Sequence, residues 1–396
     1  MRYLSSGESH GPKLTVILDG YPAGVYIDPS FVQKELTRRK IGYGRGNRML
    51  IESDSVNFTS GLRFSETTGA PICMEIENKD FKNWSDVMSP FAEYSEKKAI
   101  YKPRPGHADL SGLIKYERKD IRDILERASA RETAMKVAIG ALSKILLLNF
   151  NIEIFSVVWE IGGEGLNWED ELLHLLDKKL DIKKLHHLAE KNDLRMPLEE
   201  RKKVYEKIDL AKKEGDSLGG VFTVVIKGVP VGLGSHIQYD KRLDNKLAGN
   251  MMAIPAVKAV SIGGGLFSSQ LTGKNFHDAL FVGKNGIFRK TNYAGGIEGG
   301  ISNGEDIVIT CFMKPIPTLL TPLPSIDLKN GKSSEAVYER SDITAVPACS
   351  IVAEAVAAFT IADVFTDKFG KDTLEELRRN YSSYQKMIKK LWKKFI

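Results

Sequence analysis

Two histidines lie in turns rich in glycine and proline, and both could move protons near neutral pH. His10 lies in GESHGP (7–12) and His107 in RPGHAD (104–109). Glycine lets the backbone bend and proline stiffens it, so neither histidine is expected on the face of a helix. Histidine is the side chain that titrates near neutrality, which makes both residues candidates for proton transfer. A solvated loop histidine is the alternative at each position.

Arginines gather at two places in the chain. The stretch RRKIGYGRGNRM (38–49) holds four arginines and three glycines. Guanidinium groups bind phosphate and carboxylate as two-pronged donors, and glycine leaves a loop free to move. The second place is a predicted helix over 120–147, where Arg127 and Arg131 stand four residues apart on one face. An anion could bind there, but solvation of the loop and neutralisation of the pair by Glu132 or Asp123 remain alternatives.

Two further stretches are unusual for structure alone. NYAGGIEGGISNG (292–304) places five glycines ahead of a strand and of KPIPT (314–318). The exposed N–H groups of such a loop can line an anion or a flat ring. Beyond it, Arg340 and Asp342 precede a predicted helix that has Pro347 in its first turn. Together with the histidines, these residues favour proton chemistry on a multiply anionic substrate.

Several familiar catalytic motifs are absent or out of context. GESHG and GDSLG spell GxSxG, but each leads into a strand, whereas a nucleophile elbow follows a strand and opens a helix. The sequence has no GxxxxGK[ST], no HExxH and no GxGxxG between a strand and a helix. His186 and His187 are adjacent in a helical stretch and would point to different sides, so no metal site is expected.

The composition is that of an ordinary globular protein. Of 396 residues, 42% are apolar and 27% are charged. No signal peptide is expected, and the longest apolar stretch, Ile343 to Phe365, is interrupted by a proline and by charged residues. Cys73, Cys311 and Cys349 lack CxxC spacing, which predicts reduced thiols in a cytoplasmic protein. The net charge of +6 suits anionic small molecules at least as well as nucleic acid.

Two stretches of the chain are similar to each other. GESHGPKLTVILDGYPAG (7–24) aligns without gaps with GDSLGGVFTVVIKGVPVG (215–232), and eight of the eighteen positions are identical. Both predict a strand with a glycine turn, so we expect two related halves packed as one α/β unit. His10 of the first copy stands opposite Leu218 of the second. A turn needed only for its geometry would not require this difference, which favours a task for His10.

The remaining segments predict peripheral helices. Residues 169–214 are charged and helical in period, so we expect a helical excursion with His174, His186 and His187 on a solvated surface. Residues 371–396 predict a basic amphipathic helix that packs on the chain or on a neighbouring subunit rather than on a membrane. The catalytic unit is then 1–370, with halves at about 1–160 and 215–366.

Six motifs occur together along the chain: GESHGP, GYGRGNRM, RPGHAD, ERASARETAMKVAIGA, GGISNG with KPIPT, and ERSDITAVPA. In this order and spacing, from residue 1 to about 366, they resemble the chorismate synthases. The resemblance implies an α+β fold: a single large domain with helices sandwiched between antiparallel sheets and with two pseudo-symmetric halves. It also implies a homotetramer.

The reaction implied by this resemblance is the loss of phosphate and a ring proton from 5-enolpyruvylshikimate 3-phosphate, giving chorismate. This anti 1,4-elimination has no net redox change, yet the family requires reduced FMN. A reduced flavin can lend charge as phosphate leaves and recover it as the proton departs. Fungal members that reduce their own flavin are longer. This chain lacks their inserts, so we expect an external reductant, such as a separate flavin reductase, with NADPH as a candidate electron source.

The resemblance also implies residue roles. By the family pattern, His10 protonates the departing phosphate, His107 offsets the negative charge of the flavin ring, and Asp342 tunes the proton at the flavin nitrogen that takes up the substrate's hydrogen. Candidate ligands of the substrate's carboxylates and phosphate are Arg39, Arg45, Arg48, Arg131 and Arg340. The implied flavin contacts are Arg127, Ala128, Ser129, Pro255, Ala256, Gly299, Lys314, Pro315, Ile316, Pro317, Thr318 and Arg340. Arg39 and Arg45 are also implied contacts of a nicotinamide nucleotide.

The resemblance leaves some positions and functions open. Pro255 stands where many relatives carry asparagine, so only a backbone contact to the cofactor is expected there. His236 and His277 match no motif of the family. Two other functions are compatible with the residues: a flavin oxidoreductase, in which hydride transfer is the main event, and a nucleic-acid-binding protein. Aromatic residues are not interleaved with the basic loops, which disfavours the latter.

Overall fold

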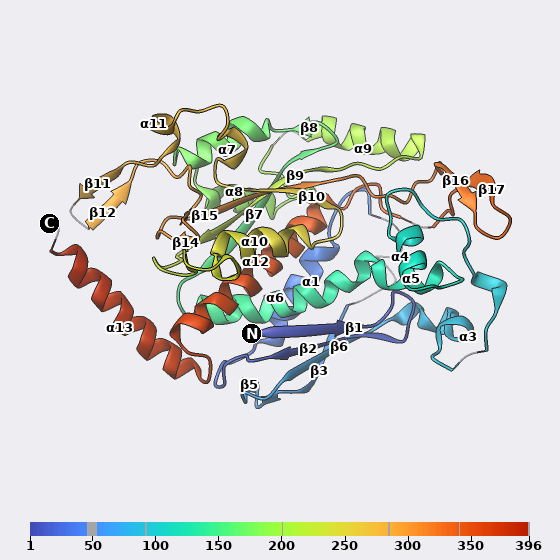
Figure 1. Cartoon of the computed structure of the whole chain (residues 1–396), viewed down its shortest axis with the longest axis horizontal. Coiled ribbons are helices and arrows are strands. Elements are labelled where there is room, and N and C mark those ends of the chain that lie inside the picture. Colours follow the sequence, from blue (N-terminus) through green and yellow to red (C-terminus); the bar gives the residue numbers. More distant parts are fainter. Residues whose placement is uncertain (46–53, 92, 200, 284–285, 340, 395–396) are drawn as a thin grey trace.

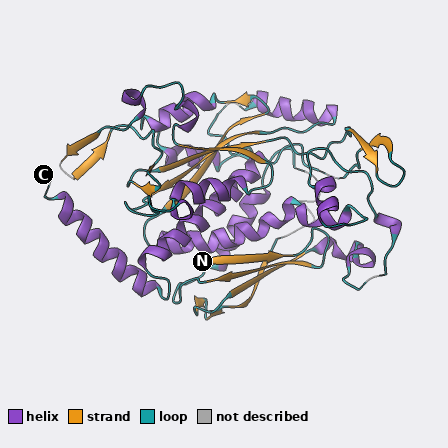
Figure 2. Cartoon of the chain, in the orientation of Figure 1, coloured by secondary structure: helices purple, strands orange, loops and turns teal. Residues whose placement is uncertain are grey.

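Residues 1–45, 54–91, 93–199, 201–283, 286–339 and 341–394 are described in the computed structural model. Over these residues the chain forms two antiparallel sheets with long helices between them (Figures 1 and 2). This arrangement confirms the α+β sandwich that the sequence resemblance implied.

The first sheet follows from an alternation of apolar and polar residues. In the strand KLTVILD, Leu14, Val16 and Leu18 are fully buried, whereas the residues between them reach the surface. The sheet has four strands in the order β1-β2-β6-β3, namely β1 (Arg2–Ser6), β2 (Lys13–Asp19), β6 (Ile72–Glu77) and β3 (Val56–Ser60). Its outer face carries Leu4 and Ile17, which are 77% and 46% exposed, so only its inner face is covered.

The second sheet is covered on both faces. Its central strand GVFTVVIK has six consecutive buried residues, as expected of a strand with helices on either side. The strand order is β10-β15-β9-β7-β8, namely β10 (Val257–Ile262), β15 (Ile307–Met313), β9 (Gly220–Lys227), β7 (Glu153–Ile161) and β8 (Glu164–Gly165). On the outer face, Leu172, Leu176 and Ile182 of the helical excursion pack against Trp159 and Val225.

Three helices fill the space between the sheets. They are α1 (Pro29–Lys40), α6 (Thr133–Leu148) and α12 (Val346–Phe369), and Figure 1 shows α6 and α12 crossing the centre of the molecule. The two central helices approach closely because Gly140 has no side chain: a Cβ at this position would lie 2.2 Å from the Cβ of Ala355. A fourth helix, α10 (Leu243–Met252), packs against α12 and β10.

The two halves share one order of elements. The first runs β1, β2, α1, β3, β6, α6, and the second runs β7, β9, α10, β10, β15, α12. Their sheets correspond, β1-β2-β6-β3 to β7-β9-β15-β10, and the pairings of β3 and of β10 both contain a bulge. In this correspondence β7 pairs with β9 and matches β1, while the boundary at about residue 160 stays a prediction. The outer limits at 215, 366 and 370 stay predictions.

A buried ionic cluster joins the halves. Glu354 of α12 is fully buried and accepts hydrogen bonds from Arg38 (2.8 Å), Lys144 (2.6 Å) and Arg195 (3.1 Å). Burial would raise the pKa of Glu354, but these three cations hold it well below its usual range. A carboxylate of the second half therefore neutralises cations on α1 and α6 of the first.

The helical excursion consists of α7 (Trp168–Leu176), α8 (Ile182–Ala189) and α9 (Lys202–Glu214). His187 is exposed, as expected, but the expectation for His186 was wrong. Its Nδ1 lies 3.0 Å from the carbonyl oxygen of Ser156, and burial lowers the pKa of this histidine. The excursion also supplies the buried Arg195 to the ionic cluster, so it is part of the core as well as a cover for the sheet.

The C-terminal helix α13 (Leu374–Trp392) extends away from the sandwich (Figure 1). Leu374 and Leu377 are buried against the body, while Met387 and Leu391 near the far end are about half exposed.

The remaining short helices are α3 (Ser85–Met88), α4 (Asp109–Lys115), α5 (Arg122–Ala128) and α11 (Gly273–Phe276). In the described part of the chain, four small hairpins pair β4 (Leu62–Arg63) with β5 (Glu66–Thr67), β11 (Leu280–Gly283) with β12 (Gly286–Arg289), β13 (Ile297–Glu298) with β14 (Ile301–Ser302), and β16 (Pro324–Asp327) with β17 (Lys332–Glu335).

Among the described residues, α12 alone is long and apolar enough to cross a membrane by length and composition. Of its most apolar 18-residue window, 89% is buried inside the molecule, which is the pattern of a core helix.

Candidate active site

Most of the candidate site residues lie on two equivalent segments. Each segment connects the last strand of one half to the long central helix of that half: residues 78–132 between β6 and α6, and residues 314–345 between β15 and α12. The segments meet through hydrogen bonds from Ser325 Oγ to the Pro103 carbonyl (2.6 Å) and from Leu328 N to the Tyr101 carbonyl (3.0 Å). A small apolar cluster of Ile100, Ile121, Leu125, Leu328 and Val337 packs at this junction.

His10 is held by a buried carboxylate. Its Nδ1 donates to the two oxygens of Glu126 over 2.9 and 3.0 Å, and its backbone N–H donates to the same carboxylate over 2.9 Å. The imidazole stacks on Trp84 with ring centroids 3.9 Å apart. Burial raises the pKa of Glu126, but hydrogen bonds from His10 and the charge of Arg122 lower it below its usual value. Glu126 is therefore ionised at neutral pH.

His107 has the same kind of support. Its Nδ1 lies 2.5 Å from Asp109 Oδ1, and Arg104 donates to both oxygens of Asp109. Burial raises the pKa of Asp109, but His107 and Arg104 lower it well below its usual range. Helix α4, which begins at Asp109, packs on α5, which carries Glu126, so the two histidines border the same pair of helices.

Two of the predicted arginines share one buried carboxylate. Arg39 Nη2 donates to Asp54 over 2.6 Å, and Arg131 donates to the other oxygen of Asp54. Burial lowers the pKa of Arg39, Asp54 raises it, and the nearby charges of Arg45 and Arg131 lower it again. Arg39 Nε is buried without a hydrogen-bond partner among the described residues. This cluster has more positive than negative charge, which suits an anionic ligand.

Asp342 lies beside the arginine-rich segment. Its carboxylate is 2.9 Å from Arg45 Nη1, and the next residue, Ile343, donates its N–H to the Gly44 carbonyl over 2.7 Å. Three residues earlier in the chain, Glu339 accepts a 3.4 Å hydrogen bond from Arg122, the residue that also holds Glu126. The segment before α12 thus connects the surroundings of His10 to those of Arg45.

The expected helix over 120–147 is broken. Helix α5 ends at Ala128, Ser129 is extended (φ −66°, ψ 143°), and α6 begins at Thr133. Arg127 and Arg131 therefore do not share a face: Arg127 bonds to the carbonyls of the Ser5–Gly7 segment, whereas Arg131 reaches Asp54. Ser129 Oγ donates to Ser9 Oγ over 3.1 Å, a contact that stabilises the break.

The arginine-rich stretch 38–49 was also expected to be a loop throughout. Instead, α1 continues to Lys40, so Arg38 and Arg39 lie on the last helical turn. Arg38 faces the buried ionic cluster, and only Arg39 faces Asp54. Arg48 and Arg340 lie outside the described residues.

The implied flavin contacts come together in part. Lys314 N donates to the Ala256 carbonyl over 2.9 Å, and Lys314 Nζ donates to the Gly106 carbonyl over 2.6 Å. Thr318 accepts a 2.8 Å bond from Arg104. The stretch 314–318, which includes Pro315, Ile316 and Pro317, therefore borders the turn that carries His107, and the pair Pro255–Ala256 is joined to that stretch through Lys314.

Gly299 lies elsewhere. Its turn packs on the start of α10, where Leu243 N donates to the carbonyl of Gly300. Pro255 follows the other end of that helix, whose ten residues span about 15 Å. The length of α10 thus lies between Gly299 and the pair Pro255–Ala256.

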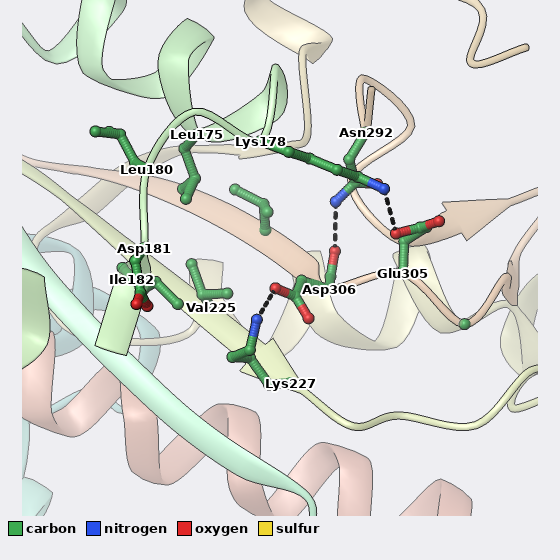
Figure 3. Close-up of a pocket in the computed structure, with 12 residues that line it drawn as sticks. Leu175, Lys178, Leu180, Asp181, Ile182, Val225, Lys227, Asn292, Glu305 and Asp306 are labelled. Carbon is green, nitrogen blue, oxygen red and sulfur yellow. Dashed lines mark hydrogen bonds and ion pairs between the residues drawn. The ribbon is translucent and has the colours of Figure 1, made fainter. Parts of the chain in front are cut away.

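A cavity of about 400 Å³ lies away from these residues (Figure 3). It is lined by the end of α7, by β9 and by the 304–306 turn, and four of its charged residues form two pairs: Lys178 with Glu305 (2.7 Å) and Lys227 with Asp306. It contains none of the predicted catalytic residues. Among the described residues, no group of three or more His, Cys, Asp and Glu could hold a metal ion.

Four polar or aromatic partners were missed at the sequence level: Asp54, Trp84, Asp109 and Glu126. Asp109 could have been found, because it lies two residues after His107. Glu126 lies 116 residues from His10 and Asp54 lies 77 residues from Arg131, and neither spacing gives a local signal.

Comparisons with known proteins agree with these motifs. Residues 1–366 match the family model described as chorismate synthase. The chorismate synthase of Caldanaerobacter subterraneus subsp. tengcongensis is 49% identical over 385 residues, which cover 97% of this chain and 98% of that protein. The chorismate synthase of Geobacter sulfurreducens is 45% identical over 401 residues, covering 98% of this chain and 99% of that protein. A crystal structure of chorismate synthase superposes with a TM-score of 0.80 at 38% identity, covering 98% of both chains.

Proposed function

The chain belongs to the chorismate synthase family, and from that premise we propose how its residues divide the work of the reaction. The family reaction is carried out by a carbon–oxygen lyase: 5-enolpyruvylshikimate 3-phosphate loses phosphate and a ring proton and becomes chorismate. One C–O bond and one C–H bond break, and the electrons remain in the product as a new double bond. The protein therefore has to bind a substrate that carries carboxylates and a phosphate, protonate the departing phosphate and stabilise charge on the ring.

Binding of the substrate is assigned to the arginines near Asp54. Arg39 and Arg131 bring two guanidinium groups to one carboxylate, with Arg45 close enough to affect the pKa of Arg39. The unpartnered Nε of Arg39 supports this role, because a buried donor needs an acceptor that the described residues do not provide. Arg48 and Arg340 complete the proposed set on the strength of their motifs.

Protonation of the departing phosphate is assigned to His10. Its imidazolium gives a proton to a phosphate oxygen as the C–O bond breaks, and solvent restores that proton after the product leaves. The observation that carries this assignment is the contact of Nδ1 with both oxygens of Glu126, because it holds the imidazole of His10 in one orientation.

The residues around His107 fit a flavin. The backbone of the 314–318 stretch and the donors Lys314 and Thr318 border the His107 turn, while Arg127 and Ser129 lie beside the His10 loop. Gly299 is included in the proposed set on the strength of its motif. When bound, reduced FMN supplies transient electron density while phosphate leaves. His107 would offset negative charge on the ring, and Asp342 would hold the proton at the flavin nitrogen.

The wider setting is proposed from the family. We place the enzyme in the cytoplasm as a homotetramer that receives its reduced flavin from a separate reductase, with NADPH as the electron source. Arg39 and Arg45 would then also meet a nicotinamide nucleotide.

The test is an anaerobic incubation of the full chain with 5-enolpyruvylshikimate 3-phosphate and photoreduced FMN. We expect many molecules of inorganic phosphate for each reduced flavin, because the reaction consumes no electrons. Consumption of one reductant for each product would indicate an oxidoreductase instead and would overturn the proposal. Release of phosphate without any flavin would overturn the role given to FMN.

A further inference from the structure

The ionised carboxylate of Glu126 leaves His10 little freedom. Both carboxylate oxygens lie within 3.0 Å of Nδ1, and one of them also accepts the backbone N–H of His10. An ionised carboxylate can only accept hydrogen bonds, so the proton of a neutral His10 ring has to be on Nδ1. Among the described residues, nothing bonds to Nε2. That nitrogen is therefore the one open to a ligand.

Glu126 is itself held in place. Its side chain is 1% exposed, and Arg122 donates to it over 2.8 Å from one turn away on α5. Arg122 is bonded in turn to the Lys98 carbonyl (2.6 Å) and to Glu339 (3.4 Å). The carboxylate therefore has few alternative positions, which is what a fixed acceptor requires.

A second contact fixes the plane of the ring. The imidazole stacks on Trp84 at an interplanar angle of 26°, and Lys98 Nζ lies 3.9 Å from the centroid of the same indole. The indole N–H of Trp84 donates a hydrogen bond to Asp80 over 3.2 Å. Stacking sets the tilt of the imidazole, while Glu126 sets its rotation and its tautomer.

We infer that Glu126 is the positioning residue of His10: it keeps the proton of the neutral ring on Nδ1 and presents Nε2 to the leaving phosphate. This inference rests on the catalytic role proposed for His10. Glu126 touches neither substrate nor cofactor in this arrangement and acts only through the histidine. His107 differs, because a single oxygen of Asp109 lies 2.5 Å from its Nδ1 and Arg104 Nη2 lies 3.1 Å from the same nitrogen.

The tautomer can be measured without turnover. The full chain is labelled with ¹⁵N-histidine, and ¹H–¹⁵N correlations of the imidazoles are recorded, with His10→Gln used to assign the His10 signals. We expect neutral His10 to carry its proton on Nδ1 in the wild type and in Glu126→Gln, whose side-chain oxygen can still accept. In Glu126→Ala we expect a population with the proton on Nε2. A wild-type ring protonated on Nε2, or a tautomer unchanged in Glu126→Ala, would overturn the inference.

The kinetic consequence is tested with a double-mutant cycle on phosphate release. Loss of a residue that orients a catalytic group typically costs about tenfold to a hundredfold, so we expect Glu126→Ala to lower kcat by that factor while KM changes little. Glu126→Gln should recover part of the loss. In a His10→Ala background, Glu126→Ala should cost nothing more, because the group it positions is absent. A full, additive loss in that background would overturn the inference.

The matched control is Asp123→Asn on the same helix. Asp123 is exposed and pairs with Arg118, with no contact to His10, so both the tautomer and kcat should remain as in the wild type. A His10→Ala enzyme with normal kcat would overturn the proposed role of His10 and the positioning role with it. A slow His10→Ala enzyme with an unchanged tautomer in Glu126→Ala would overturn only the inference about Glu126.

Discussion

The loop before β2 and the loop before β9 have a similar backbone path but differ in one side chain, His10 in the first and Leu218 in the second. In both, the chain docks on the residues that precede the long helix of its half: Ser9 N donates to the Glu126 carbonyl, and Leu218 N, one position further along the repeat, donates to the Ile343 carbonyl. At the equivalent positions, however, His10 meets the carboxylate of Glu126, whereas Leu218 packs near Gly162. Local geometry is therefore shared by the halves, and the chemistry depends on one side chain and its distant partner.

The sheets differ in a similar way. The second sheet has its outer face covered by the helical excursion, while the outer face of the first carries the exposed Leu4 and Ile17. The central helices lie between them, with Glu354 of the second half surrounded by cations of the first half and of the excursion. Substitutions at three places test these differences: at this junction, at the two loops and at the crossing of the central helices.

The largest effect is expected where the halves are joined. Glu354→Ala leaves Arg38, Lys144 and Arg195 buried without their shared carboxylate. Removing one partner of a buried ion pair costs about 3 to 5 kcal/mol, so we expect the free energy of unfolding to fall by that amount in urea titrations. As a control, Glu375→Ala removes an exposed ion pair with Arg378 and should cost less than about 1 kcal/mol. Equal losses in both variants would show that the cluster does not hold the halves together.

The next largest effect is expected when the loop residues His10 and Leu218 are each replaced by the other's side chain. His10→Leu makes the first loop resemble the second and should lower the rate of phosphate release roughly ten- to a thousandfold, because one proton-transfer group is lost. Leu218→His makes the opposite change and should leave the rate near that of the wild type, because it leaves His10 and its contact with Glu126 unchanged. Circular dichroism checks that both variants fold. A normal rate in His10→Leu would remove the functional difference between the loops.

A smaller effect is expected at the crossing of α6 and α12. Gly140→Ala places a methyl group 2.2 Å from Ala355 Cβ and should destabilise the protein by about 1 to 3 kcal/mol through overpacking. Ala355→Gly removes the facing methyl group and should cost about 1 kcal/mol through helix propensity. The double variant moves the methyl from one helix to the other, so its loss should be smaller than the sum of the two. Strict additivity in thermal unfolding would contradict a direct contact.

The smallest effect concerns pH and the helical excursion. Burial raises the pKa of Glu190, but the opposing effect of Arg38 and Arg195 is larger and lowers this pKa to about 2. Because the folded value lies below the ordinary 4.5, Glu190 stabilises the fold above about pH 4.5, and this contribution is lost as the pH falls towards about 2. Glu190→Gln should therefore lower stability at neutral pH and flatten the acid dependence in this range. Urea unfolding at several pH values measures both, and an unchanged slope would contradict the ion pairs.

The sequence determined the burial of the strands and the identity of the motifs. KLTVILD alternates and is covered on one face, while GVFTVVIK is continuously apolar and is covered on both. The glycines of the repeat also predicted corresponding turns, since Gly20 and Gly228 both have positive φ (76° and 81°). These properties are local, because they depend on the periodicity of side chains and on the conformational freedom of single residues.

Only the tertiary structure decided which charged groups meet. The neighbours Arg38 and Arg39 bind different carboxylates. Arg127 and Arg131 are separated by a break in the helix at which the sequence has no glycine or proline. The hydrogen-bond acceptor of His10 lies 116 residues away in the chain. A buried charge is stable only beside a partner, and that partner can come from any segment that the fold brings near. Periodicity shows that a side chain is buried or exposed, but it contains no information about which distant group will neutralise it.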